Sequence, residues 1–342
     1  MSAIAIRQTF AAAAFPKRGQ TNPMDRVWIQ CPQCSAPLGA IQYGALVHGA
    51  IRMCCSSCSF CLSQEAGIWN ALPVARARYF RQFVREYEHI RSREGRGSDA
   101  ADFYLALPYK DLTGRNPSQW KIRARSFTYF QRRILPELAL RTKGNLLCLD
   151  LGAGNAWLSY RLAQLGHAPV AVDLLTNSAD GLGAAPNYRA ATPRLFPRFQ
   201  AELDCLPFRD AQFDCAIFSA SFHYSENYEA TLGEAIRCLK PGGTVLIIDS
   251  PWYSNEENGR RMVSERRTHF QAHFGTHSDS LRSCEYLTDQ RLTELEKSFG
   301  LRWKRHKPWY GLRWALRPWV AKLMRRREPS VFQIYSAEVL VR

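Results

Sequence analysis

The sequence predicts an α/β fold built on a parallel β-sheet, and three neighbouring observations predict it. Residues 146–151 are an apolar run that contains one acid, Asp150. Two glycines one residue apart, Gly152 and Gly154, follow at once. A second apolar run then ends in another acid, Asp173. This order is typical of a buried strand, a tight turn, a helix and a neighbouring parallel strand.

The glycine turn and the second acid favour a ligand that carries a nucleoside. Glycines let the backbone approach a ligand at the N-terminus of a helix, and an acid at the end of the neighbouring strand reaches ribose hydroxyl groups. The dinucleotide pattern G-x-G-x-x-G would need a small third residue, but Trp157 stands there. No G-x-x-x-x-G-K-[ST] loop occurs near the turn, so a triphosphate site is not predicted.

Residues 150–156 resemble motif I of the class I S-adenosylmethionine (SAM)-dependent methyltransferases, D-x-G-x-G-x-G, with Ala156 at the third glycine. A glycine turn in another α/β protein is the alternative for this motif taken alone. Residues 202–208, 213–218 and 239–249 then resemble, in order, the acidic-x-x-x-LPF, FD-x-V and LKPGG-x-L-x-I-x-D blocks of ubiquinone-biosynthesis-type methyltransferases. The resemblance covers about residues 145–255. It implies a Rossmann-like seven-stranded sheet, SAM as cofactor and methyl transfer as the reaction.

The same resemblance assigns the cofactor site residue by residue. Asp173 is expected to hold the ribose, and Glu202 with the backbone around Leu203 is expected beside the adenine. The stretch that begins at Ser219 is similar to a segment next to the methyl donor in small-molecule methyltransferases. The expected cofactor-binding residues are Asp150, Gly152, Ala153, Gly154, Asp173, Glu202, Leu203 and Ser219.

Catalytic residues are harder to assign, because positioning alone can accelerate methyl transfer and a base is needed only if the acceptor loses a proton. No Asn-Pro-Pro-Tyr or Asp-Pro-Pro-Tyr segment follows the fourth strand, and that pattern serves methylation of base and glutamine amino groups. His223 is a candidate base for a phenol or enol, since its reference pKa is near neutral. A hydrogen-bonded structural histidine is the alternative. Tyr224 and Tyr253 complete the candidate catalytic set, and Tyr109 and Trp120 are candidate pocket residues.

Six of the eleven cysteines lie within residues 31–61. Two C-x-x-C pairs about twenty residues apart offer four thiolates for tetrahedral Zn²⁺, although the second pair has two registers. The segment resembles the small zinc-ribbon activators of tRNA and release-factor methyltransferases, related forms of which are fused to methyltransferases. That resemblance selects Cys31, Cys34, Cys55 and Cys58 as ligands of a structural zinc and leaves Cys54 and Cys61 spare. A ribbon without metal and a redox dithiol are the alternatives.

The chain divides into four predicted parts. Residues 1–30 are expected to be a disordered extension, 31–72 a zinc ribbon, 73–142 a helical linker or cap, and 143–342 the methyltransferase domain. Apolar spacing predicts helices over 74–93 and 120–138 in the linker. Within the last part, residues 308–330 form an amphipathic insertion rich in Trp, Leu and Arg, which describes an interfacial helix or a lid. No apolar run approaches the roughly 20 residues of a membrane span.

Charge is unevenly placed along the chain. The formal net charge of +16 divides into +12 for residues 1–145, −4 for 146–255 and +8 for 256–342. Basic flanks favour a polyanion, either RNA or an anionic membrane surface, and scattered solvated arginines are the alternative. The single cysteines in apolar surroundings are typical of a reducing cytosol. We therefore expect a cytoplasmic protein, with peripheral membrane contact as a further option.

The sequence as a whole predicts a SAM-dependent methyltransferase that acts on a small, lipophilic or aromatic acceptor. The absent base-methylating motif, the His223-Tyr224 segment and the Trp-rich insertion favour that acceptor class. The alternative is methylation of tRNA or a translation-associated protein, which the ribbon and the basic flanks favour; RNA is the less favoured partner. A third reading is a ribbon module with an inactive methyltransferase domain, and the intact motif I weighs against it.

Overall fold

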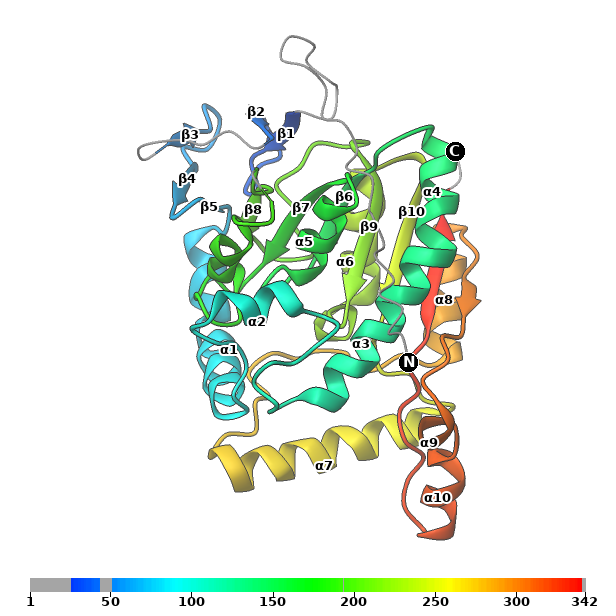
Figure 1. Ribbon diagram of the computed structural model, residues 1–342. Coiled ribbons are helices and arrows are strands. Elements are labelled where there is room, and N and C mark those ends of the chain that lie inside the picture. The colour runs from blue at the N-terminus through cyan, green and yellow to red at the C-terminus, as the bar shows by residue number, and fades with distance from the viewer. Residues whose placement is uncertain (1–25, 44–50, 193, 340–342) are drawn as a thin grey trace, which may run out of the picture.

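The computed structural model describes residues 26–43, 51–192 and 194–339 (Figure 1). One ten-stranded sheet runs through it in the order β11-β12-β10-β9-β6-β7-β8-β5-β4-β3. Its strands are β3 (Arg52–Cys54), β4 (Cys61–Glu65), β5 (Ile68–Asn70), β6 (Leu147–Leu151), β7 (Ala168–Asp173), β8 (Arg198–Gln200), β9 (Phe213–Ser219), β10 (Leu239–Ile248), β11 (Lys304–His306) and β12 (Ile334–Glu338).

Seven of these strands, from β11 to β8, form the sheet that the sequence predicts, and the expected Rossmann-like fold class is confirmed. The central strands β8, β7, β6, β9 and β10 are parallel to one another, and β12 is inserted antiparallel between β10 and β11. All five residues of β6 are buried, as a strand covered on both faces requires. The strand order reverses between β6 and β9, which places a topological switch point at their carboxyl ends.

Helices cover both faces of the sheet. Alternate residues of β10 point to opposite sides, so Val245 and Ile247 join one core and Leu246 and Ile248 join the other. α6 and α8 pack on the first face, and α3, α4 and α5 pack on the second. The helices are α1 (Val74–Arg93), α2 (Ala101–Ala106), α3 (Pro117–Tyr129), α4 (Leu135–Thr142), α5 (Trp157–Gln164), α6 (Tyr228–Cys238), α7 (Glu256–Phe274), α8 (Asp289–Phe299), α9 (Leu312–Ala315) and α10 (Arg317–Leu323).

The linker is helical, as the apolar spacing predicts, and α1 occupies the predicted range. A π-helical turn at Phe130–Ile134 joins α3 to α4. Figure 1 shows α1, α2 and α3 gathered at one end of the sheet, and α7 runs across the same end. The helices α1, α2 and α3 at this end of the sheet are together called the cap here.

The cysteine-rich segment, here called the ribbon (residues 26–43 and 51–72), is joined to the sheet itself. β5 pairs in parallel with β8, so that Trp69 stands opposite Phe199, and their rings stack with centroids 6.5 Å apart. A separate hairpin of β1 (Arg26–Gln30) and β2 (Pro37–Gln42) is fastened by the Gln30 N–H, which donates to the Pro207 carbonyl oxygen at 3.1 Å. β1 begins the ribbon five residues before the predicted boundary at residue 31; the predicted disordered extension otherwise lies outside the described residues.

The insertion at residues 308–330 forms a hairpin of two short helices, α9 and α10, with Pro318 near the start of α10. Figure 1 shows this hairpin extending away from the body of the protein. Neither helix buries a side chain. Within the described ranges, no helix has both the length and the apolar character needed to cross a bilayer.

Candidate functional site

The turn between β6 and α5 lies at the switch point and is held by its neighbours on both sides. The N–H groups of Gly152 and Ala153 donate to the Val172 carbonyl oxygen of β7 at 2.8 and 3.0 Å. Gly152 has a φ of +73°, and a Cβ added there would lie 2.3 Å from the Cβ of Ser221. The positive φ and the closeness of Ser221 both require a residue without a side chain at position 152. Because glycine has none, the backbone of the turn is exposed to a ligand.

A cavity of about 110 Å³ opens at this turn. Six of the eight residues expected to bind the cofactor line it, together with Tyr224 from the candidate catalytic set. The cap supplies the opposite wall through Phe83, Tyr87 and Arg91 of α1 and Arg123 of α3. The predicted residues on the wall are Gly152, Ala153, Gly154, Asp173, Leu203, Ser219 and Tyr224.

Asp173 presents its carboxylate at the end of β7. Oδ2 accepts from the Gly154 N–H at 2.7 Å and Oδ1 accepts from the Leu175 N–H at 2.8 Å. Burial nevertheless raises the pKa of Asp173 to about 6. The carboxylate is thus fixed in orientation by two backbone donors while it faces the cavity.

Asp150, which is expected to bind the cofactor, does not line this cavity. Its Oδ2 accepts from the Ser159 N–H at 3.1 Å and from the Ser159 hydroxyl at 2.7 Å, both in the first turn of α5. Burial raises the pKa of Asp150 to about 7. In the structure its hydrogen bonds therefore hold the N-terminus of α5 in place.

Glu202, which is expected beside the adenine, is also not on the wall of this cavity. Its two carboxylate oxygens accept from the Nε of Arg76 in α1 at 3.1 and 2.8 Å. The pair lines a different cavity, beside the ribbon and Cys205. Arg76 and Glu202 are 126 residues apart in the sequence, so the motif around Glu202 does not predict this ion pair.

The candidate catalytic residues separate in the structure. Tyr224 lines the cavity and packs edge-on against Tyr87, with ring centroids 5.6 Å apart. His223 lies off the cavity wall, with Nδ1 3.4 Å from the Ser250 hydroxyl. Burial, together with Arg266 and Arg123, lowers the pKa of His223 to about 3. The imidazole is therefore a much weaker base than its reference pKa predicts.

Tyr253 is buried away from the cavity, where its hydroxyl accepts from Nη1 of Arg327 at 3.3 Å. The two candidate pocket residues, Tyr109 and Trp120, do not line the cavity either. Tyr109 is 52% exposed and lies off the cavity wall. Trp120 is buried edge-on against Trp157, with centroids 6.1 Å apart, and so supports the cap behind the cavity.

Sequence reasoning missed the two arginines of the cavity. Arg91 donates to Asp180 at 2.5 Å, and this ion pair closes one side. Arg123 lies with Cζ 4.8 Å from the Trp120 ring centroid, and burial lowers its pKa to about 10. Within the described residues, Arg123 has no ion-pair partner. A half-buried cation at a cavity wall, with no ion-pair partner among the described residues, fits an anionic group of a ligand.

A second polar cluster lies directly after β10. The Ser126 hydroxyl donates to Oδ1 of Asp249 at 2.5 Å and lies 2.8 Å from the Tyr310 hydroxyl. In the part of the chain that the structure describes, Oδ2 of Asp249 is buried without a partner. Burial raises the pKa of Asp249 to about 6. Since Ser126 follows Arg123 by one helical turn, this cluster adjoins the cavity wall.

Four cysteine sulfurs converge at the tip of the ribbon. The ligand atoms of Cys31, Cys34, Cys55 and Cys58 all lie within 4.8 Å of one another. The turn after β1 carries the first two, and the turn between β3 and β4 carries the other two. Four thiolates at this separation fit the closed tetrahedral set of a structural zinc site.

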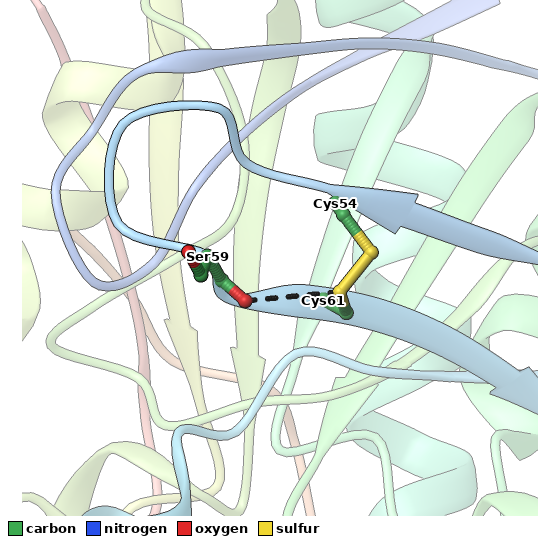
Figure 2. The surroundings of a disulfide bond; sticks show 3 residues. All are labelled: Cys54, Ser59 and Cys61. Carbon is green, nitrogen blue, oxygen red and sulfur yellow. Dashed lines mark hydrogen bonds between the residues drawn. A yellow bond between two sulfur atoms is a disulfide. The ribbon is translucent and has the colours of Figure 1, made fainter.

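The two cysteines expected to be spare are joined in a disulfide, Cys54–Cys61 (Figure 2). They stand opposite each other where β3 pairs with β4. The hairpin register brings these two residues, which are seven apart in the sequence, face to face. The pairing also leaves the four-sulfur cluster as the set of cysteines free to bind a metal in the ribbon.

Residues 149–247 match the model of a methyltransferase domain family. Over these residues the chain is similar to methyltransferase domains, and several curated methyltransferases match the same part of it. The demethylmenaquinone methyltransferase of Thermus thermophilus is 33% identical over 35% of this chain and 54% of that protein. The ubiquinone/menaquinone biosynthesis C-methyltransferase of Francisella tularensis is 26% identical over 35% of this chain and 48% of that protein.

Among solved structures, the 1,6-didemethyltoxoflavin-N1-methyltransferase of Burkholderia thailandensis, with bound 1,6-didemethyltoxoflavin and S-adenosylhomocysteine, is 16% identical. The similarity covers 87% of this chain and 98% of that one, with a TM-score of 0.43. The chain spans about half the length of the curated quinone-pathway relatives that it matches.

The glycine turn can be tested by adding one methyl group. Gly152→Ala places a Cβ 2.3 Å from Ser221 at a positive φ, so we expect it to cost about 2–5 kcal/mol of unfolding free energy. Gly144→Ala is the control, because a Cβ there meets nothing within 4 Å. Chemical denaturation measures both, and equal stability of the two variants would contradict the proposed crowding.

Proposed function

We propose that this chain transfers a methyl group from SAM to a small, lipophilic or aromatic acceptor. The observation that supports this most is the combination, around one cavity, of a glycine turn, a fixed carboxylate and an aromatic cap. SAM would supply an electrophilic methyl group on its sulfonium. The residues of the chain would bind and orient both partners, exclude water and accept a proton where the acceptor requires it.

For the cofactor, we assign ribose recognition to Asp173, whose carboxylate already faces the cavity. The backbone of Gly152 and Gly154 forms the floor on which the cofactor would lie, and Leu203 supplies an apolar wall. We assign the carboxylate of the cofactor's methionine part to Arg123, since that cation has no partner among the described residues. Glu202 is left out of the assignment because Arg76 already occupies its carboxylate.

For the acceptor, the aromatic side chains Phe83, Tyr87 and Tyr224 favour a flat or apolar molecule. A phenol or enol would also need a proton acceptor. Asp249 suits this step better than His223, because its pKa of about 6 is closer to neutrality than the value of about 3 for the histidine. The names of the Thermus relative, a demethylmenaquinone methyltransferase, and of the Francisella relative, a ubiquinone/menaquinone biosynthesis C-methyltransferase, are consistent with such an acceptor.

A macromolecular acceptor is the second candidate function, and the four-sulfur ribbon is the observation that favours it. Purified protein with methyl-labelled SAM and a cell extract separates the two. We expect label in the fraction that organic solvent extracts, and expect an Asp173→Ala variant to abolish it. Label recovered in RNA or protein instead would replace the small acceptor by the second candidate.

Ribose binding by Asp173 predicts a pH dependence. The carboxyl has a raised pKa of about 6, and hydroxyl donors favour its ionised form. SAM affinity should therefore rise about tenfold as the pH increases from about 5 to about 7, and binding at the lower pH should release a proton. Calorimetry measures both quantities.

An Asp173→Asn variant should bind about tenfold to a hundredfold more weakly at neutral pH, without this slope. Asp249→Asn is the matched control, because its carboxyl titrates in the same range but lies off the cofactor wall. A slope that vanishes in Asp249→Asn and persists in Asp173→Asn would contradict the ribose assignment.

We further propose that Cys31, Cys34, Cys55 and Cys58 bind one structural zinc. Cys31→Ser and Cys58→Ser should each lose the metal and destabilise the ribbon, because four-thiolate sites couple binding to folding. Cys54→Ser is the control: it removes the disulfide but should retain one zinc per chain. Elemental analysis measures the zinc content of each variant. If Cys54 were a zinc ligand, the Cys54→Ser control would lose the metal as well.

A further inference from the structure

The hairpin at residues 308–330 carries an apolar surface that the described part of the protein leaves uncovered. Leu323 at its tip is 85% exposed, and Trp319 is 73% exposed. Both belong to α10, whose other apolar residues also face outward. The large apolar side chains that are each more than half exposed here include Trp309, Leu312, Leu316, Trp319, Val320 and Leu323.

Positive charge surrounds this apolar surface. Residues 307–327 contain seven Lys and Arg residues and no Asp or Glu. Arg313, Lys322 and Arg325 are exposed, and within the described ranges none of them has an ion-pair partner. Large apolar side chains and cations without an ion-pair partner among the described residues therefore occupy the same hairpin.

The base of the hairpin is firmly attached to the body. Trp314 stacks on Phe332 with ring centroids 5.5 Å apart, and Cζ of Arg317 lies 3.6 Å from the Trp314 ring centroid. Tyr310 reaches Ser126 of α3. The N–H of Val331 donates to the Trp252 carbonyl oxygen at 2.9 Å. The hairpin is thus held outward from the same end of the sheet that carries the cavity (Figure 1).

We propose that this hairpin docks on an anionic lipid membrane. Indole and leucine side chains enter the boundary between headgroups and acyl chains, while Lys and Arg stems extend toward lipid phosphates. RNA would engage the cations but leave the projecting apolar side chains in water. A membrane satisfies both components at once.

Docking would place the carboxyl edge of the sheet, and the cavity beside it, close to the bilayer surface. A lipophilic acceptor dissolved in the bilayer would then reach the cavity without crossing water. This consequence rests on the proposed function, whereas the docking itself does not. The attachment of Tyr310 to Ser126, which bonds Asp249, connects the docked hairpin to the acceptor side of the site.

Vesicle sedimentation of the full chain tests the docking. The wild type should bind phosphatidylcholine vesicles that contain about one third phosphatidylglycerol, and bind pure phosphatidylcholine more weakly. Leu323→Ser should lower the partition coefficient about tenfold, and addition of Trp319→Ser should lower it by about a hundredfold in total. Leu140→Ser is the matched control, because Leu140 is 80% exposed on α4, outside the hairpin.

Charge is tested separately. Lys322→Gln and Arg325→Gln should each weaken binding to the anionic vesicles about fivefold and leave binding to neutral vesicles unchanged. Each variant is also titrated with SAM, and affinity equal to that of the wild type shows that the protein is folded. Hairpin-dependent vesicle binding without any SAM binding would support the docking while removing the proposed function.

Three results overturn the docking. The wild type fails to sediment with either vesicle, or Leu323→Ser binds no more weakly than Leu140→Ser. The third is that the hairpin variants lose self-association in analytical ultracentrifugation while vesicle binding is absent, which would assign the surface to a second copy of the chain.

Discussion

The parallel pairing of β5 with β8 is the interaction on which the rest of the structure depends. It makes the ribbon part of the central sheet, and it also fixes where the chain goes next. The Ala71 N–H still donates to the Gln200 carbonyl oxygen at 2.9 Å, and α1 begins three residues later at Val74. α1 then supplies Phe83, Tyr87 and Arg91 to the cavity. The cysteine cluster and the cofactor wall are therefore connected by one short, hydrogen-bonded segment.

This connection also explains the uneven charge along the chain. The cap is basic and the central segment is acidic, and the structure joins the two. Arg76 of α1 pairs with Glu202, and Arg91 of the same helix pairs with Asp180. Part of the positive charge that favours a polyanion in the sequence is thus neutralised inside the protein. The cations of the hairpin, which have no ion-pair partner in the part of the chain that the structure describes, remain as an outward-facing group.

The sequence predicts those features of the fold and of the site that are determined by residues close together in the chain. An apolar run, two glycines and a closing acid define β6, the turn and β7, and these place Gly152 and Asp173 on the cavity wall without reference to other segments. The cysteine spacing likewise brings together the four sulfurs. Each of these features is decided within about thirty residues, where backbone geometry leaves few alternatives.

The sequence fails where a distant partner decides the direction of a side chain. Glu202 turns to Arg76, and Asp150 turns to Ser159 behind the turn. The imidazole of His223 is a suitable general base by residue type, but burial lowers its pKa to about 3. Arg123 was missed because a single arginine in a basic helix gives no signal until the helix is placed over the cavity. Such contacts depend on the packing of the cap, which no motif encodes.

The ends of the large sheet have a consequence for the behaviour of the protein in concentrated solution. In the described part of the chain, its outermost strands are β3 and β11, and each is only three residues long. β11 reads Lys304-Arg305-His306, and β3 begins at Arg52 and is cross-linked to β4 by the disulfide. Short, charged edge strands are poor templates for strands of another molecule. A sheet of ten strands is thus protected against edge-to-edge aggregation at both of its margins.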